Sequence, residues 1–149
     1  MGIGVTVGMI VAFMFLMPLI TQAFPVPQVD NSRFDILRGN LPNLILNVVA
    51  AWFTAGFLEE LLWRGYLMNR LVDLQGNKTK LAWVISLVGS ALIFGLGHMY
   101  QGLGGVIKIT AVGLLFGAAF LTVRRNLWPV IIAHALLETV GFVQDYFGG

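Results

Sequence analysis

The chain has 149 residues, of which 58% are hydrophobic and 11% are charged, and its formal net charge is +2. This composition excludes a soluble globular domain and is typical of a polytopic membrane protein. The small, scattered charge excludes a nucleic-acid partner, and the absence of cysteine excludes disulfides and a cysteine nucleophile. We expect an all-α transmembrane bundle of about five spans, embedded in the lipid bilayer as one domain over residues 1–149.

The first expected span covers residues 4–24, because no residue from Met1 to Val29 is charged and the stretch is long enough to cross a bilayer. A cleaved signal peptide is the alternative, since Thr-Gln-Ala resembles a cleavage site, although the positive n-region is missing. Residues 25–43 are rich in turn-forming residues and predict a loop, with a short interfacial helix at about residues 33–39.

Four further apolar segments follow the loop. A long helix is expected from about Leu44 to Leu74, and it exceeds what a bilayer requires, so it must tilt or protrude. The third span covers residues 81–98 and ends in a glycine-rich segment at residues 97–105. The fourth and fifth spans cover residues 106–123 and 127–147, and the small pair Gly113 and Gly117 predicts close helix packing.

Basic residues between the spans predict the orientation in the membrane. Five lie on one predicted side, Arg70, Lys78, Lys80, Arg124 and Arg125, against Arg33, Arg38 and a Lys108 that reaches the membrane surface by snorkelling. The first side is therefore expected to be cytoplasmic. We expect a multi-pass protein of the cytoplasmic membrane of a prokaryote, with its N-terminus inside.

Ionisable residues inside membrane spans cost several kcal/mol on most scales, so each is a functional candidate. The expected spans contain six of them, which include both histidines of the chain and three of its seven acids. They are Glu59, Glu60, Arg64, His98, His134 and Glu138.

Helical spacing divides the two adjacent glutamates by role. Glu60 and Arg64 are four residues apart and can neutralise each other on one helix face. Glu59 is rotated about 100° away from Glu60 and is less fully compensated. We therefore expect a structural pair between Glu60 and Arg64 and a chemically active Glu59.

The two histidines also have defined neighbours one helical turn away. Phe94 precedes His98 by four residues, and His134 precedes Glu138 by four. A packing ion pair, an interfacial His98 and a core pair of His134 with Glu138 would explain these residues separately. We favour one shared site, because three such coincidences in one small bundle are less probable.

Three short patterns in this order resemble the motifs of the CAAX-protease and bacteriocin-processing family, also called the CPBP or Abi family. They are "EELLWR" with Glu59, Glu60 and Arg64, "FGLGH" with Phe94 and His98, and "HALLE" with His134 and Glu138. The resemblance covers residues 44–147 and identifies this segment as the expected catalytic core. Family members usually carry additional spans, and they have Asn or Asp where this chain has Glu138.

The resemblance implies an intramembrane glutamic endopeptidase that acts on a peptide or protein in or near the membrane. Glu59 and His98 would activate a water molecule, with Glu59 as general base. His134 and Glu138 would stabilise the oxyanion, and Glu60, Arg64 and Phe94 would support the site. The resemblance implies no metal or other cofactor.

Other mechanisms remain open at this stage. Two histidines with Glu59 and Glu138 would also supply a zinc ligand set, although no HExxH motif supports it. Ser86 and Ser90 lack a histidine partner in helical register, which disfavours a covalent mechanism. A proton-coupled transporter or a non-catalytic immunity protein is the alternative from another class.

One distance does not fit a shared site. Glu59 is expected slightly on the cytoplasmic side of the midplane and His98 near the opposite end of its helix. The mismatch is roughly 10 to 15 Å at 1.5 Å per residue, so tilted, displaced or broken helices are needed to remove it.

Overall fold

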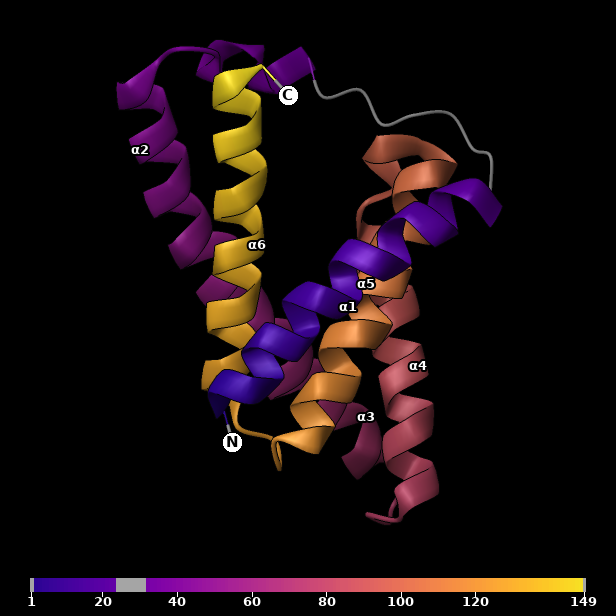
Figure 1. Cartoon of the computed structure of the whole chain (residues 1–149). Helices are drawn as coiled ribbons and strands as arrows, with labels where there is room; N and C mark the ends of the chain where they lie inside the picture. The colour runs from indigo at the N-terminus through magenta and orange to yellow at the C-terminus, as the bar shows by residue number, and fades with distance from the viewer. Residues whose placement is uncertain (1, 24–31, 149) are drawn as a thin grey trace.

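A computed structural model describes residues 2–23 and 32–148, which form a bundle of helices with no strand in these ranges (Figure 1). Within the described residues, five helical segments are long and apolar enough to cross a membrane, which confirms the predicted fold class. They are α1 (Gly2–Ala23), the continuous helix Leu41–Leu74, α4 (Lys80–Gly97), the segment Met99–Thr122 that contains α5 (Gly102–Thr122), and α6 (Leu127–Phe147). The predicted loop residues 25–31 lie outside the described residues, and the short helix expected after them is the 3-10 helix η1 (Ser32–Leu37).

The helix that carries both adjacent glutamates is not a uniform α-helix. It begins as α2 (Leu41–Ala51), continues through the π-helical segments η2 (Trp52–Glu59) and η3 (Leu61–Leu67), and ends as α3 (Met68–Leu74). π-Helical turns are rare and often occur at functional sites. The π-helical segments meet at Glu60, so the irregular backbone lies where the predicted site begins.

Two helices begin three or more residues earlier than predicted. The long helix starts at Leu41 because the Asn40 side chain accepts a hydrogen bond from the Asn43 N–H, and Pro42 fits the first turn. α5 starts at Gly102, whose φ of +74° forms the turn after the short 3-10 helix η4 (Met99–Gln101). The following glycines, predicted as loop, are therefore part of the helix.

Glycines bring the helices close together around the centre of the bundle. A Cβ on Gly56 of η2 would lie 2.9 Å from the Ala135 Cβ of α6. A Cβ on Gly113 of α5 would lie 3.0 Å from the Ala91 Cα of α4, and one on Gly117 would overlap Leu87. The packing role predicted for Gly113 and Gly117 is therefore confirmed, and it joins α4 to α5.

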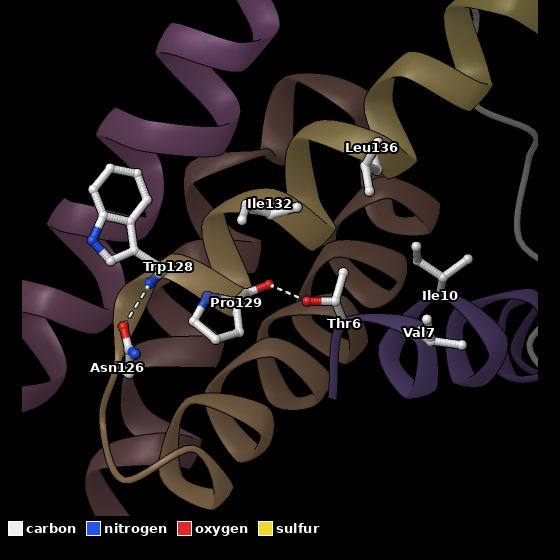
Figure 2. Close-up of a pocket in the computed structure, with 8 residues that line it drawn as sticks. All are labelled: Thr6, Val7, Ile10, Asn126, Trp128, Pro129, Ile132 and Leu136. Carbon is white, nitrogen blue, oxygen red and sulfur yellow. Dashed lines mark hydrogen bonds between the residues drawn. The ribbon is translucent and has the colours of Figure 1, made fainter. Parts of the chain in front are cut away.

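α1 lies obliquely across α5 and α6 and packs against both (Figure 1). Near its start, the Thr6 hydroxyl donates a hydrogen bond of 3.1 Å to the Pro129 carbonyl, as Figure 2 shows. Figure 2 also shows Asn126, whose side chain accepts from the Trp128 N–H and caps α6. The first turns of α1 and α6 therefore lie at the same end of the bundle.

Candidate active site

One cavity of about 580 Å³ lies between α1, η2, α4, α5 and α6. All four residues predicted to be catalytic line it: Glu59 from η2, His98 from the end of α4, and His134 and Glu138 from α6. Phe94 and Phe116 also contribute to its wall. The structure thus brings together side chains that are up to 79 positions apart in the sequence, counted from Glu59 to Glu138.

Glu60 and Arg64 lie behind the cavity wall and form the predicted ion pair. The Arg64 Nη1 donates to the Glu60 Oε1 at 2.8 Å, and both side chains are buried. The Arg64 Nη2 donates to the Gly113 carbonyl at 3.2 Å, and the guanidinium stacks over the rings of Phe94 and Phe116. This cation therefore joins the long helix to α4 and α5.

His134 is held by Glu60 rather than by the partner predicted from helical spacing. Its Nδ1 lies 2.8 Å from the Glu60 Oε1, whereas its Nε2 lies 4.0 Å from the Glu138 Oε1, beyond hydrogen-bond distance. Since Glu60 accepts from Arg64 as well, an N–H on the His134 Nδ1 satisfies the same carboxylate oxygen. The Nε2 atom is then the one left for chemistry.

His98 ends α4 and is oriented by its own helix. Its Nδ1 lies 2.9 Å from the Phe94 carbonyl oxygen, so that an N–H at this atom donates to the backbone. The imidazole packs edge-on against the Phe94 ring with 4.8 Å between centroids. The predicted contact of Phe94 with His98 is therefore present, and the Nε2 of this histidine is also available.

The predicted height mismatch between Glu59 and His98 is wrong, because both side chains line the same cavity. α3 and α4 are packed neighbours joined by a short turn, so heights are measured from that turn. Glu59 then lies about 22 Å before the turn and His98 about 27 Å after it, at 1.5 Å per residue. The long helix extends past the site at its η1 end, so counting from the middle of the helix placed Glu59 too close to the cytoplasmic side.

In its described residues, the structure does not support a serine nucleophile or a preformed metal site, two alternatives considered from sequence. Ser86 accepts a hydrogen bond from the Gln75 side chain, and Ser90 donates to the Leu87 carbonyl; neither lines the cavity. Within residues 2–23 and 32–148, no three His, Asp or Glu side chains are grouped closely enough to hold a metal ion.

The cavity is also lined by polar residues that the sequence analysis did not assign to the site. They are Tyr100, Gln101, Lys108 and Gln144. Lys108 was expected to reach the membrane surface, but it lies on the same α5 face as Val112 and Phe116, which also line the cavity. Its four-residue spacing from Val112 was the available sequence signal.

The bundle and its cavity define a polytopic membrane protein with ionisable side chains gathered inside the membrane-spanning region. Residues 41–140, which include all three motifs, match the family model of the Rce1-like type II CAAX prenyl endopeptidases. The chain therefore belongs to this family of CAAX-type membrane endopeptidases, as the motifs predicted, and the family implies a membrane-associated peptide substrate. No curated protein and no solved structure shows significant similarity to the chain.

Proposed function

We propose that the protein is an intramembrane endopeptidase that hydrolyses a peptide bond with a water molecule activated by Glu59. The observation that carries the proposal is the convergence of Glu59, His98, His134 and Glu138 on one cavity. A cavity of about 580 Å³ is large enough for several peptide residues and the attacking water. The family supplies the reaction class, and the cavity supplies groups for each step.

Glu59 is the proposed general base and His98 its assistant. Glu59 lines the cavity, whereas the adjacent Glu60 is fully buried and bound to Arg64 and His134. A carboxylate that accepts a proton from water must reach that water, and Glu59 is the one of the two that meets this condition. The Nε2 of His98 would share the same water or protonate the leaving amine.

His134 and Glu138 are the proposed stabilisers of the oxyanion. Since the Nδ1 of His134 is bound to Glu60, its Nε2 would donate toward the cavity when it is protonated. Glu138 lies beside that nitrogen and would donate in its neutral carboxyl form. These two donors come from one face of α6, so their relative position is fixed by the helix.

A zinc-dependent reaction is the second candidate, and one observation favours it. Each histidine has its Nδ1 on an oxygen acceptor and its Nε2 available, which is also the arrangement of most metal-binding histidines. His98, His134 and one carboxylate would have to move closer together to hold the ion, which would supply a Lewis acid for water activation. We propose the metal-independent reaction, and metal content and chelator sensitivity of the purified protein separate the two.

The test compares Glu59→Gln with Glu60→Gln in purified protein in proteoliposomes. The probes are a prenylated peptide that ends in a C-a-a-X sequence and its unprenylated counterpart. Glu59→Gln should reduce cleavage by about 100-fold or more and leave the protein folded, because an amide cannot accept the proton. Glu60→Gln should lower the free energy of unfolding by about 3 kcal/mol, since it leaves a buried Arg64 without its counter-charge.

Asp73→Asn is the matched control, because it makes the same kind of change at an exposed residue outside the cavity. It should change neither cleavage nor stability measurably. Undiminished cleavage by Glu59→Gln would show that another group is the base. Stoichiometric zinc that is lost in His98→Ala or His134→Ala would establish the metal-dependent reaction. Absence of cleavage by the wild type, with pH-driven flux in liposomes, would favour a transporter.

A further inference from the structure

Lys108 is a cation within the membrane-spanning part of α5 that the proposed reaction does not use. It lines the cavity together with the four residues of the proposed reaction. No ion pair or hydrogen bond engages its ammonium group within the described ranges 2–23 and 32–148, although Glu59 and Glu138 line the same cavity. The other cation near the site, Arg64, is by contrast fully satisfied by Glu60 and Gly113.

An unpaired ammonium inside a membrane span is costly, so a lysine there normally pairs with an acid or reaches the surface. Lys108 is partly buried and lines the cavity, and the amides of Gln101 from η4 and Gln144 from α6 line it as well. Amide side chains donate hydrogen bonds to anions without adding charge. A cation without an ion-pair partner, in a cavity that also contains neutral amide donors, is a suitable site for one carboxylate of a ligand.

The position of Lys108 along α5 gives this carboxylate a defined distance from the site of cleavage. Lys108, Val112 and Phe116 follow one face of the helix, and the Phe116 ring packs against His134 with 4.9 Å between centroids. Lys108 is therefore two turns, about 12 Å, along α5 from the level of the proposed oxyanion site. An extended peptide advances about 3.3 to 3.6 Å per residue, so about three residues fit this distance.

We propose that Lys108 binds the C-terminal carboxylate of the substrate and thereby sets cleavage about three residues from the end of the peptide. The inference rests on the proposed function, since it assumes that the scissile bond lies between Glu59 and His134. A C-a-a-X motif ends three residues after its cysteine, so the spacing from Lys108 to Phe116 along α5 agrees with the family to which the chain belongs. Lys108 is a specificity-determining residue in this account and takes no part in bond cleavage.

Binding is the first test, because it does not depend on turnover. In the Glu59→Gln background, the affinity for a C-a-a-X peptide with a free C-terminal carboxylate is compared with that for its C-terminal amide. The free acid should bind about 10-fold more tightly, as a hydrogen bond to a charged group is worth about that factor. Lys108→Met should abolish the difference, and Lys108→Arg should retain most of it.

Lys80→Met is the matched control, since it removes the same charge from an exposed position at the start of α4, outside the cavity. It should keep the preference for the acid. Equal affinity of the Glu59→Gln protein for acid and amide, including no measurable binding of either, overturns the assignment, as does a preference that persists in Lys108→Met.

Product analysis with the otherwise wild-type enzyme is the second test. When three residues are added to the C-terminus of the peptide, the cleaved bond should move with the new end, and Lys108→Met should lose this dependence. A cleaved bond that stays at the same sequence position contradicts the inference and leaves the proposed endopeptidase intact. An acid preference in binding without cleavage of any peptide would instead support the role of Lys108 in ligand binding and contradict the proposed function.

Discussion

The Glu60 carboxylate connects two helices through a single oxygen atom. Its Oε1 accepts from Arg64 on its own helix and lies 2.8 Å from the His134 Nδ1 on α6. Its Oε2 is buried and has no hydrogen-bond partner in the described part of the chain. Burial of this acid costs desolvation free energy, and in this position its carboxylate orients a neighbouring group. Here the ordered group is the His134 imidazole, which faces the cavity.

The contact between Glu60 and His134 bears on whether Glu138 orients His134 or stabilises the oxyanion. A role in orienting His134 requires a hydrogen bond, but the two side chains are 4.0 Å apart and Glu60 already holds the ring. The Glu138 side chain is 41% exposed, so it can turn into the cavity. Donation to the oxyanion is then the remaining role in the proposed reaction, and an ionised carboxylate would repel that charge.

Amide and alanine substitutions at Glu138 test this role. Glu138→Gln and Glu138→Asn should retain or raise kcat, because an amide N–H donates where the neutral carboxyl does. Glu138→Ala should lower kcat by about 100-fold, the loss typical of a removed oxyanion donor, with little change in stability. The measurement is kcat for the three variants and the wild type on one peptide. Equal large losses in the amides and in alanine would mean that the anion is required.

At the scale of helices, the site depends on how closely η2 approaches α6. Glu59 and Glu60 belong to the long helix and His134 to α6, so any separation of the two changes the Glu60 to His134 distance. Gly56 lies one turn before Glu60, and a Cβ there would meet the Ala135 Cβ at 2.9 Å. Trp52 reinforces the same contact by donating from its indole nitrogen to the Thr139 hydroxyl at 3.0 Å.

Gly56→Ala should therefore destabilise the protein by about 1 to 3 kcal/mol, the range for overpacked cores, and reduce cleavage as well. Gly141→Ala in α6 is the control, since a Cβ there meets nothing within 4 Å. It should be neutral or stabilising by up to about 1 kcal/mol, because alanine favours the helix. Reversible unfolding in detergent micelles measures both. A Gly56→Ala variant as stable as Gly141→Ala would show that the helix contact is not tight.

Local sequence signals predicted the elements well and the site only in part. The fifth span was predicted with its observed bounds, since Asn126 and Gly148 cap it and the apolar run fills it. Contacts one helical turn apart were also accessible, as the Glu60 to Arg64 pair shows. The Glu60 to His134 contact was not, because it joins residues 74 positions apart and depends on how two helices pack.

For the same reason the π-helical segments of the long helix escaped prediction. Their apolar pattern also fits an α-helix, so local propensity does not distinguish the wider turns. The inward position of Lys108 was also not predicted. Lys108 is the seventh residue of α5, close enough to the helix end for its long side chain to reach the membrane surface. In each case the missing information was how the helices pack against one another.

The whole molecule has two ends with different charge. The α3–α4 turn and the α5–α6 turn lie at one end, where the Arg125 guanidinium stacks over Trp83 in the first turn of α4 at 4.8 Å. η1 and the end of α6 lie at the other end, joined by the hydrogen bond from the Gly39 N–H to the Tyr146 carbonyl. The first end therefore gathers the five basic residues that predicted the cytoplasmic side.

This charge difference predicts the orientation of the bundle in the membrane. By the positive-inside rule, we expect the end with the α3–α4 turn to face the cytoplasm and η1 to face outward. Because the chain contains no cysteine, single substitutions report accessibility without further changes. Asn77→Cys lies in the α3–α4 turn and Ile36→Cys in η1, both at exposed positions, while Val88→Cys lies on the exposed apolar surface of α4 as an internal control.

In intact cells, a membrane-impermeant maleimide should label Ile36→Cys at once and Asn77→Cys only after permeabilisation. Val88→Cys should stay unlabelled in both conditions, because a thiol in the hydrocarbon core does not meet the reagent. Labelling of Asn77→Cys in intact cells, with Ile36→Cys protected, would reverse the orientation. Lys108 lies in the same half of the bundle as η1 and the end of α6. In the reversed orientation, peptide carboxylates would therefore reach Lys108 from the cytoplasm. In the expected orientation they reach it from outside, so peptides with a free C-terminal carboxylate that are added to intact cells should bind at Lys108.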